Sequence, residues 1–257
     1  MTDGSAIRKL TVDRLQIEIY ENREALGQAA GRAVAARIQD LLGQQAHVRM
    51  IFAAAPSQNE LLDQLVRDWT IDWSRVTAFH MDEYIGLPAD APQSFSRFLR
   101  ERLFDRVNFR DVHTIDPSND RRRECDRYGG LLREAPIDIV CLGIGENGHL
   151  AFNDPPVADF RDPASVKVVE LDEVCRRQQV NDGCFARLQE VPTHAITLTI
   201  PTLLSASHLF CVVPGPSKRQ AVTATLQDPI GAACPSTILR THPDCTLYVD
   251  RDAFGEP

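Results

Sequence analysis

Short apolar runs alternate with longer helix-like segments along most of this 257-residue chain, and that alternation limits the folds open to it. Parallel strands need a crossover connection, usually a helix, whereas antiparallel strands can be joined by a short turn. The repeated strand-then-helix order therefore predicts an α/β fold: a mostly parallel twisted sheet with helices on both faces, Rossmann-like and three-layered. We expect a single domain over residues 1–257, because neither a linker nor an internal repeat breaks the pattern.

The expected elements follow from periodicity. The expected strands are 15–20, 48–55, 76–81, 137–142, 195–200, 208–213 and 246–249, and the expected helices are 24–44, 58–69, 94–103, 121–134 and 218–226. The run at 15–20, Leu-Gln-Ile-Glu-Ile-Tyr, alternates with period two, which is typical of an edge strand. In open α/β sheets ligands bind beyond the carboxyl ends of strands, so polar segments that follow strands are candidate sites.

Charge and cysteine usage exclude several classes of protein. The net charge is −8, and the densest basic cluster, residues 121–123, is flanked by acidic residues, so we expect no nucleic-acid partner. The seven cysteines show no C-x-x-C spacing, which favours buried, reduced thiols over a metal site. Residues 1–6 are polar, and no apolar run reaches membrane-spanning length. We therefore expect a cytoplasmic protein that has no membrane partner.

The first polar segment is 79–88, Phe-His-Met-Asp-Glu-Tyr-Ile-Gly-Leu-Pro, at the end of an apolar strand. Neighbouring side chains of a strand point to opposite faces, so Asp82 and Glu83 would have different tasks, one facing a cleft and the other binding structure. Two surface acids before a turn would give the same pattern.

The second polar segment is 143–155, Gly-Ile-Gly-Glu-Asn-Gly-His-Leu-Ala-Phe-Asn-Asp-Pro, directly after the expected strand 137–142. Its glycines let the backbone turn sharply or approach a ligand closely. His149 can exchange a proton near neutral pH, and Asp154 could orient its imidazole. A glycine-rich turn with a structural histidine is the alternative, and the glycine spacing is weak evidence for a dinucleotide site.

Together these segments resemble the glucosamine-6-phosphate deaminase/isomerase family, which is related to 6-phosphogluconolactonase. Residues 81–88 match its Met-Asp-Glu-Tyr-x-Gly-Leu-Pro motif, and residues 143–155 are close to Gly-Ile-Gly-x-Asp-Gly-His-x-Ala-Phe-Asn-Glu-Pro. Residues 215–218 match its Gly-x-x-Lys phosphate loop. Residues 197–204, His242-Pro243 and Asp250 match its later segments, so the resemblance spans nearly the whole chain.

The resemblance implies conversion of an amino-sugar 6-phosphate, such as glucosamine 6-phosphate, to a ketose 6-phosphate and ammonia, with no metal and no organic cofactor. It implies that Asp82 moves a proton between C2 and C1, that His149 opens the sugar ring, and that Asp154 supports His149, with Asn147 at the same site. Lys218 would bind the phosphate; the other substrate-binding residues that it implies are Ala54, Ala55, Ser57, Glu83, Gly148 and Arg177. The oligomeric state is left open, a homo-oligomer included.

The sequence departs from the family pattern at several positions. Asn147 replaces an aspartate and Asp154 a glutamate, which predicts a weaker charge partner for His149. The early phosphate loop lacks its glycines and reads Ala-Ala-Ala-Pro-Ser-Gln at 53–58, although backbone N–H groups and Ser57 can still bind phosphate there. Asp182 falls near the position of the family's phosphate-binding arginine, and we expect Arg176 or Arg177 to replace that arginine.

Two other functions stay open, and one regulatory expectation follows. A lactonase-like hydrolase shares the Gly-His motif but lacks Met-Asp-Glu-Tyr, and a non-catalytic sugar-phosphate sensor would bind the ligand without turnover. Allosteric members carry Ser, Arg and Lys after the histidine motif, where this chain has Pro-Val-Ala-Asp-Phe-Arg at 156–161. We therefore expect no activation by an N-acetylated sugar phosphate.

Overall fold

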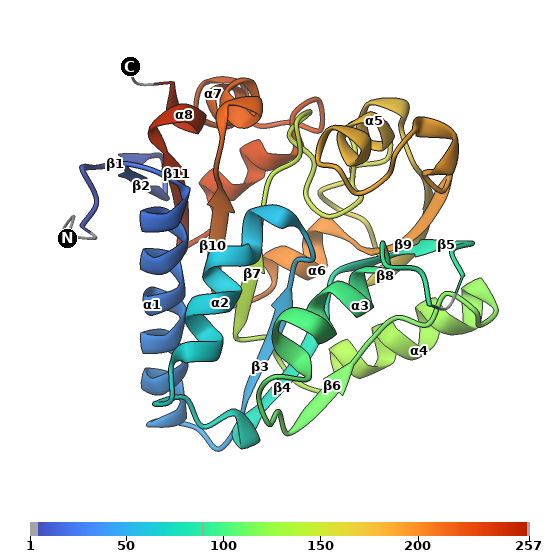
Figure 1. The fold of residues 1–257 in the computed structure, drawn as a ribbon, viewed down its shortest axis with the longest axis horizontal. Coiled ribbons are helices and arrows are strands. Elements are labelled where there is room, and N and C mark those ends of the chain that lie inside the picture. Colours follow the sequence, from blue (N-terminus) through green and yellow to red (C-terminus); the bar gives the residue numbers. More distant parts are fainter. Residues whose placement is uncertain (1–4, 89, 256–257) are drawn as a thin grey trace.

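The computed structural model describes residues 5–88 and 90–255, so most of the polar N-terminal segment 1–6 lies outside the described residues. Figure 1 shows a central sheet flanked by helices. The strands are β1 (Arg8–Val12), β2 (Leu15–Tyr20), β3 (Val48–Phe52), β4 (Val76–His80), β5 (Asp82–Ile85), β6 (Asp111–His113), β7 (Ile139–Leu142), β8 (Val166–Glu170), β9 (His194–Leu198), β10 (His208–Val213) and β11 (Cys245–Asp250).

The main sheet has the strand order β1-β2-β11-β10-β7-β3-β4-β6. Every neighbouring pair from β2 to β6 is parallel, and β1 adds an antiparallel edge. The mostly parallel α/β sheet predicted from the sequence is confirmed. The chain runs outward from β3 in one direction and from β7 in the other, so these two adjacent strands mark the topological switch point, where α/β proteins bind ligands.

Helices cover both faces of this sheet (Figure 1). They are α1 (Arg23–Leu42), α2 (Asn59–Arg67), α3 (Phe95–Leu99), α4 (Arg121–Arg133), α5 (Glu173–Asn181), α6 (Ile200–Leu204), α7 (Arg219–Gln227) and α8 (Arg251–Phe254). None of the helices in the described ranges is long and apolar enough to cross a membrane.

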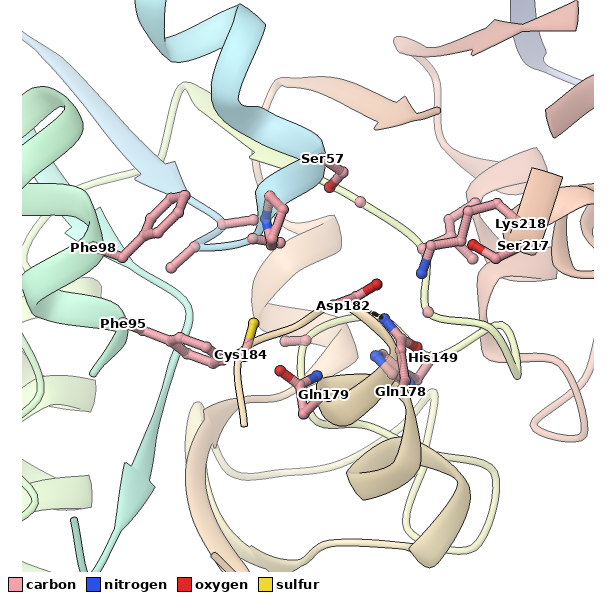
Figure 2. Close-up of a pocket in the computed structure, with 18 of the residues that line it drawn as sticks. Ser57, Phe95, Phe98, His149, Gln178, Gln179, Asp182, Cys184, Ser217 and Lys218 are labelled. Atoms are coloured by element: carbon pink, nitrogen blue, oxygen red, sulfur yellow. Dashed lines mark hydrogen bonds between the residues drawn. The ribbon is translucent and has the colours of Figure 1, made fainter. Parts of the chain in front are cut away.

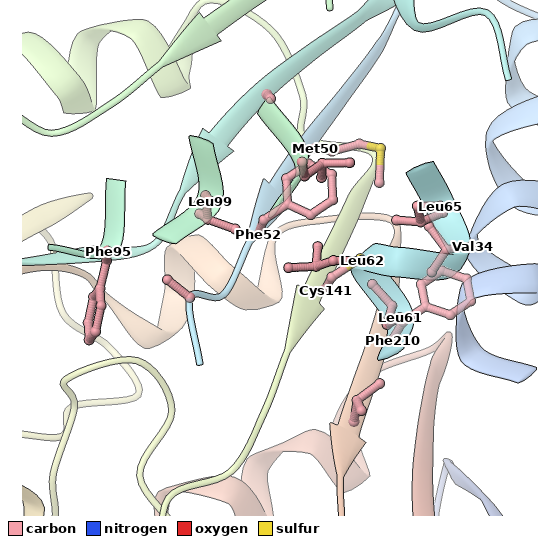
Figure 3. Close-up of a cluster of buried hydrophobic side chains, with 14 of the residues drawn as sticks. Val34, Met50, Phe52, Leu61, Leu62, Leu65, Phe95, Leu99, Cys141 and Phe210 are labelled. Carbon is pink, nitrogen blue, oxygen red and sulfur yellow. The ribbon is translucent and has the colours of Figure 1, made fainter. Parts of the chain in front are cut away.

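Two buried clusters of apolar side chains hold the layers together. In β3, Met50 and Phe52 pack into the cluster under α1 and α2, while Ile51 packs into the cluster on the opposite face. Figure 3 shows Met50 and Phe52 beside Leu61, Leu62 and Leu65 of α2. This alternation explains why the central strands are continuous apolar runs: both of their faces are buried.

Two expectations about strands are wrong. The strand 195–200 was expected in the parallel sheet, but β9 lies in a separate antiparallel sheet of order β5-β9-β8. The strand 15–20 was expected at an edge, but β1 pairs with it and takes the edge position. In both cases the expected strand exists, and the neighbour that changes its position is a short strand with weak periodicity.

Candidate active site

A cavity of about 580 Å³ opens at the carboxyl ends of four parallel strands of the main sheet. Residues 53–57 follow β3, residues 81–82 follow β4, residues 143–145 follow β7, and residues 214–218 follow β10. Figure 2 shows Ser57, His149, Ser217 and Lys218 around this space. The cavity therefore lies at the topological switch point, where the sequence predicted its candidate sites.

Asp82 and Glu83 do have different environments. Asp82 lines the cavity although its side chain is 6% exposed. Burial, with a smaller contribution from the charge of Glu83, raises the pKa of Asp82 well above its ordinary value. Because the carboxyl is held away from water but faces the cavity, it is suited to accept a proton from a ligand in the cavity.

His149 reaches the cavity wall with one of its ring nitrogens already engaged. Its Nδ1 lies 2.8 Å from Asn147 Oδ1 and 2.9 Å from Asp154 Oδ1. Both neighbours are acceptors, so Nδ1 carries the proton and Nε2 is the nitrogen left for proton exchange. The shorter side chain of Asp154 therefore does reach the imidazole.

The amide of Asn147 makes hydrogen bonds to both His149 and Asp154. Its Oδ1 accepts from the backbone N–H of His149 at 3.1 Å, and its Nδ2 donates to Asp154 Oδ1 at 2.9 Å. A second carboxylate could accept from the imidazole but would repel Asp154. Burial opposes ionisation of Asp154, yet the hydrogen bonds from His149 and Asn147 outweigh it and lower its pKa. Asp154 is thus a charged partner for the imidazole.

Two glycines leave room for the packing of the segment that carries the His149 imidazole. A Cβ on Gly145 would lie 2.1 Å from His149 Cε1, so any other residue would displace the ring. Gly148 has a φ of +81°, and a Cβ there would meet Cys234 Sγ at 2.5 Å. The glycine pattern of this segment is therefore required by the packing of the histidine and by a left-handed turn.

Strand β9 ties the two polar segments together. Its Thr197 pairs with Asp82 in the antiparallel sheet, and the Thr197 hydroxyl accepts from Phe152 N at 3.1 Å. Asn153 Nδ2 donates to the Leu198 carbonyl at 2.8 Å. The small sheet thus fixes the segment of Asp82 relative to the segment of His149.

The loop after β3 is held by Gln58, which is fully buried. Its Nε2 lies 3.1 Å from Ser57 Oγ and 3.4 Å from the carbonyls of Leu142 and Val212. These carbonyls lie at the ends of β7 and β10. The Gln58 amide, which follows β3, therefore links the ends of β3, β7 and β10. Ala54, Ala55 and Ser57 line the cavity as the sequence predicted.

The loop after β10 presents Lys218. Gly215 N donates to both carboxylate oxygens of Asp250 at 3.0 Å, and Lys218 N donates to the Gly215 carbonyl at 3.1 Å. Lys218 is 7% exposed, and burial lowers the pKa of its ammonium group, partly opposed by the charges of Asp182 and Glu146. A buried ammonium that faces a cavity is suited to bind an anion.

Three residues predicted to bind substrate lie elsewhere among the described residues. Glu83 is buried and accepts from the backbone N–H groups of Tyr84, Phe95 and Ser96 and from Ser94 Oγ. Gly148 packs against Cys234 and is absent from the cavity lining. Arg177 is exposed and pairs with Glu173. In this structure all three have structural or surface contacts.

Sequence reasoning missed the wall formed by α5 and the residues after it. Gln178, Gln179, Asp182 and Cys184 line the cavity (Figure 2). No motif marks them, because amide side chains in a polar helix resemble a solvated surface. Arg176, the other candidate to replace the missing arginine, instead donates to the carbonyls of Leu188 and Val191.

One cluster has donor atoms of metal-ligand type. His149, Asp154 and Cys175 bring a ring nitrogen, a carboxylate oxygen and a sulfur within 4.8 Å of one another. His149 Nδ1 already lies 2.9 Å from Asp154 Oδ1, and Asn147 is hydrogen-bonded to both side chains, which accounts for their proximity. The cluster therefore fits a hydrogen-bonded relay, and we assign no metal to it.

Residues 21–247 match the family model described as glucosamine-6-phosphate isomerases/6-phosphogluconolactonase. A glucosamine-6-phosphate deaminase of Bacillus cytotoxicus is 34% identical over 242 residues, which cover 94% of this chain and 88% of the relative. A second one, from Bacillus thuringiensis, is 40% identical over 186 residues, covering 72% of this chain and 69% of the relative.

Solved structures show the same architecture. A monomeric glucosamine-6-phosphate deaminase superposes with a TM-score of 0.84 at 28% identity, covering 94% of this chain and 99% of that one. A 6-phosphogluconolactonase from Thermotoga maritima gives a TM-score of 0.76 at 20% identity, covering 92% and 99%. At that identity the second likeness concerns the fold alone.

Proposed function

Because the chain belongs to the glucosamine-6-phosphate isomerase/6-phosphogluconolactonase family, we propose that it is a glucosamine-6-phosphate deaminase. The reaction takes one glucosamine 6-phosphate and one water and yields a ketose 6-phosphate and ammonia. The observation that carries this proposal is the pairing of Asp82, a buried carboxyl, with His149, an oriented imidazole, on one cavity that also holds Lys218.

The chemistry is divided among these residues. His149 Nε2 exchanges a proton with the ring oxygen and opens the sugar ring, while Asp154 and Asn147 hold Nδ1–H. Asp82 then transfers a proton from C2 to C1, which leaves a hydroxyl on C1 and an imine at C2. The water adds to this imine, and ammonia leaves to give the C2 ketone. Acid–base help of this kind contributes about 10²–10⁴-fold to a rate.

The phosphate would bind between the loops after β3 and β10. Lys218 supplies the cation, and the backbone N–H groups near Ser57 and Ser217 supply neutral donors where short helical turns begin. The seven free cysteines fit a reducing compartment, so we place the reaction in the cytoplasm.

The test is a screen of hexosamine 6-phosphates for ammonia release, with glucosamine 6-phosphate first and 6-phosphogluconolactone in parallel. We expect ammonia and ketose 6-phosphate in equal amounts from glucosamine 6-phosphate, and loss of both in Asp82→Asn. Lactone hydrolysis without ammonia release would assign the hydrolase function instead. Tight binding of the sugar phosphate without turnover, unchanged in Asp82→Asn, would indicate a sensor.

A further inference from the structure

Helix α5 forms part of the cavity wall, yet the mechanism above gives it no task. Its buried side chains include Cys175 and Gln178, which are three residues apart and therefore share one face. Val174 and Arg177 are exposed on the other side, Val174 at 49%. The inner face of α5 contacts the segment that carries His149.

Gln178 makes a hydrogen bond to the turn that precedes His149 in the chain. Its Oε1 accepts from Glu146 N at 2.7 Å, and its Nε2 donates to Asp182 Oδ2 at 3.2 Å. The same turn is closed by Gly145 N, which donates to the His149 carbonyl at 3.0 Å. Gln178 is 7% exposed, and loss of its oxygen would remove the acceptor of the half-buried Glu146 N–H.

Cys175 lies behind the imidazole. Asp154 Oδ1 takes the bonds from His149 and Asn147, while Asp154 Oδ2 has no conventional hydrogen-bond partner among residues 5–88 and 90–255. The Cys175 sulfur lies within 4.8 Å of a carboxylate oxygen of Asp154 and of a ring nitrogen of His149. Burial raises the pKa of Cys175, so it remains a thiol that can donate.

We propose that α5 positions the reacting imidazole, Gln178 by fixing the Glu146 backbone and Cys175 by fixing the Asp154 carboxylate. The inference rests on the proposed deaminase function and adds two positioning residues to it. Neither Gln178 nor Cys175 contacts the reacting atoms, and both act through His149. A displacement of about 1 Å in a reacting group can cost about 100-fold in rate, so such contacts matter.

The first test compares Gln178→Met with Gln178→Glu. Methionine removes the acceptor for Glu146 N, so kcat should fall about 3- to 10-fold, the rate equivalent of one hydrogen bond, with KM changed less than twofold. Glutamate keeps the acceptor oxygen for Glu146 N but would repel Asp182, so it is paired with Asp182→Asn, and this double variant should restore kcat to within about threefold of wild type.

The second test compares Cys175→Ala with Cys175→Ser. Alanine removes the thiol beside the Asp154 carboxylate, so kcat should fall about 3- to 10-fold, with KM changed less than twofold. Serine keeps an O–H donor and should restore kcat to within about threefold of wild type. If Cys175 merely fills space, stability would change and both variants would keep wild-type kcat.

The matched control is Val174→Ala, on the exposed side of the same helix, which should keep wild-type kcat. Thermal melts identify any variant that fails to fold. If Gln178→Met or Cys175→Ala does not fold, the test is made with the Gln178→Glu, Asp182→Asn double variant and Cys175→Ser. The proposal is overturned if wild type releases ammonia while Gln178→Met and Cys175→Ala keep its kcat. If wild type itself releases none, the proposed function fails instead.

Discussion

At the scale of single residues, the environment of Asp82 determines when it can act. A base must be ionised, and burial keeps the pKa of this carboxyl well above its ordinary value. We therefore expect kcat/KM to fall on acidification at a higher pH than an exposed aspartate would allow. Asp82→Asn should lower kcat about 10²–10⁴-fold across the whole range. Rate measurements between pH 4.5 and 9, buffered at constant ionic strength, check both points; a flat profile would contradict the assignment.

The same pKa shift predicts a gain in stability on removing the charge. The folded state binds a proton on Asp82 more tightly than the unfolded state, so ionisation destabilises the fold as pH rises from the unfolded pKa through the raised folded pKa. Asp82→Asn should therefore melt at a higher temperature than wild type above that window and at the same temperature below it. Melting curves at pH 3.5 and pH 8 provide the comparison.

Lys218 gives the clearest prediction about substrate affinity. It lines the cavity and has no ion-pair partner within the described part of the chain. Lys218→Met should raise KM for a sugar 6-phosphate about 10- to 100-fold, because a charge-assisted hydrogen bond is worth about 1.5–3 kcal/mol. The inhibition constant of inorganic phosphate should rise in parallel. An unchanged phosphate affinity would show that the anion binds elsewhere.

The residues of the cavity differ in how clearly the sequence predicts their role. Asp82, His149 and Lys218 follow strands and have glycines or prolines within a few residues, so residue type and position both indicate a site. Gln178 and Asp182 stand in a polar segment without a period, and their role depends on where α5 folds back. Arg177, expected at the phosphate, is exposed and pairs with Glu173, because proximity in sequence does not fix proximity in space.

At the scale of elements, the pairing of β5, β9 and β8 in an antiparallel sheet was not predicted from the sequence, and neither were β1, β6 and α5. Strands β5 and β8 of this sheet have four and five residues, too short for period-two alternation to stand out. The central strands β3 and β10 and helix α1 were predicted to within a few residues, since continuous apolar runs and alanine-rich segments are strong signals.

Glu83 stabilises an element rather than the substrate. It accepts from Phe95 N at 3.1 Å and Ser96 N at 2.9 Å at the start of α3, and from Tyr84 N at 3.0 Å. Glu83→Ala should lower the free energy of unfolding by about 2–4 kcal/mol, since buried N–H groups lose their acceptor. Glu101→Gln, an exposed change near α3, should stay within about 0.5 kcal/mol of wild type. Urea denaturation measures both.

At the scale of the whole molecule, the strand order could not be derived from the sequence. Periodicity indicates which segments are strands, but adjacency follows from long-range packing, such as the placement of β7 between β10 and β3. The general rule that ligands bind at strand ends was enough to locate the cavity, because it needs no particular order.

The segment after the histidine motif bears on regulation. Lys167 Nζ donates to the Val157 carbonyl at 2.8 Å and to Asp162 at 2.9 Å, so this cation is already engaged. We expect a hyperbolic dependence of rate on substrate, unchanged by N-acetylglucosamine 6-phosphate. A sigmoid response that this compound relieves would refute the expectation.

All four loops of the cavity leave the strands at their carboxyl ends. The opposite end of the molecule, at the amino ends of these strands, therefore takes no part in the reaction. The connections that enter β3, β4 and β10, at 43–47, 68–75 and 205–207, lie at the amino ends of the same strands. Trp69, 91% exposed, stands on one of them. Dyes, affinity handles or surface linkers attached there would leave turnover untouched, because the length of the strands separates them from the sugar.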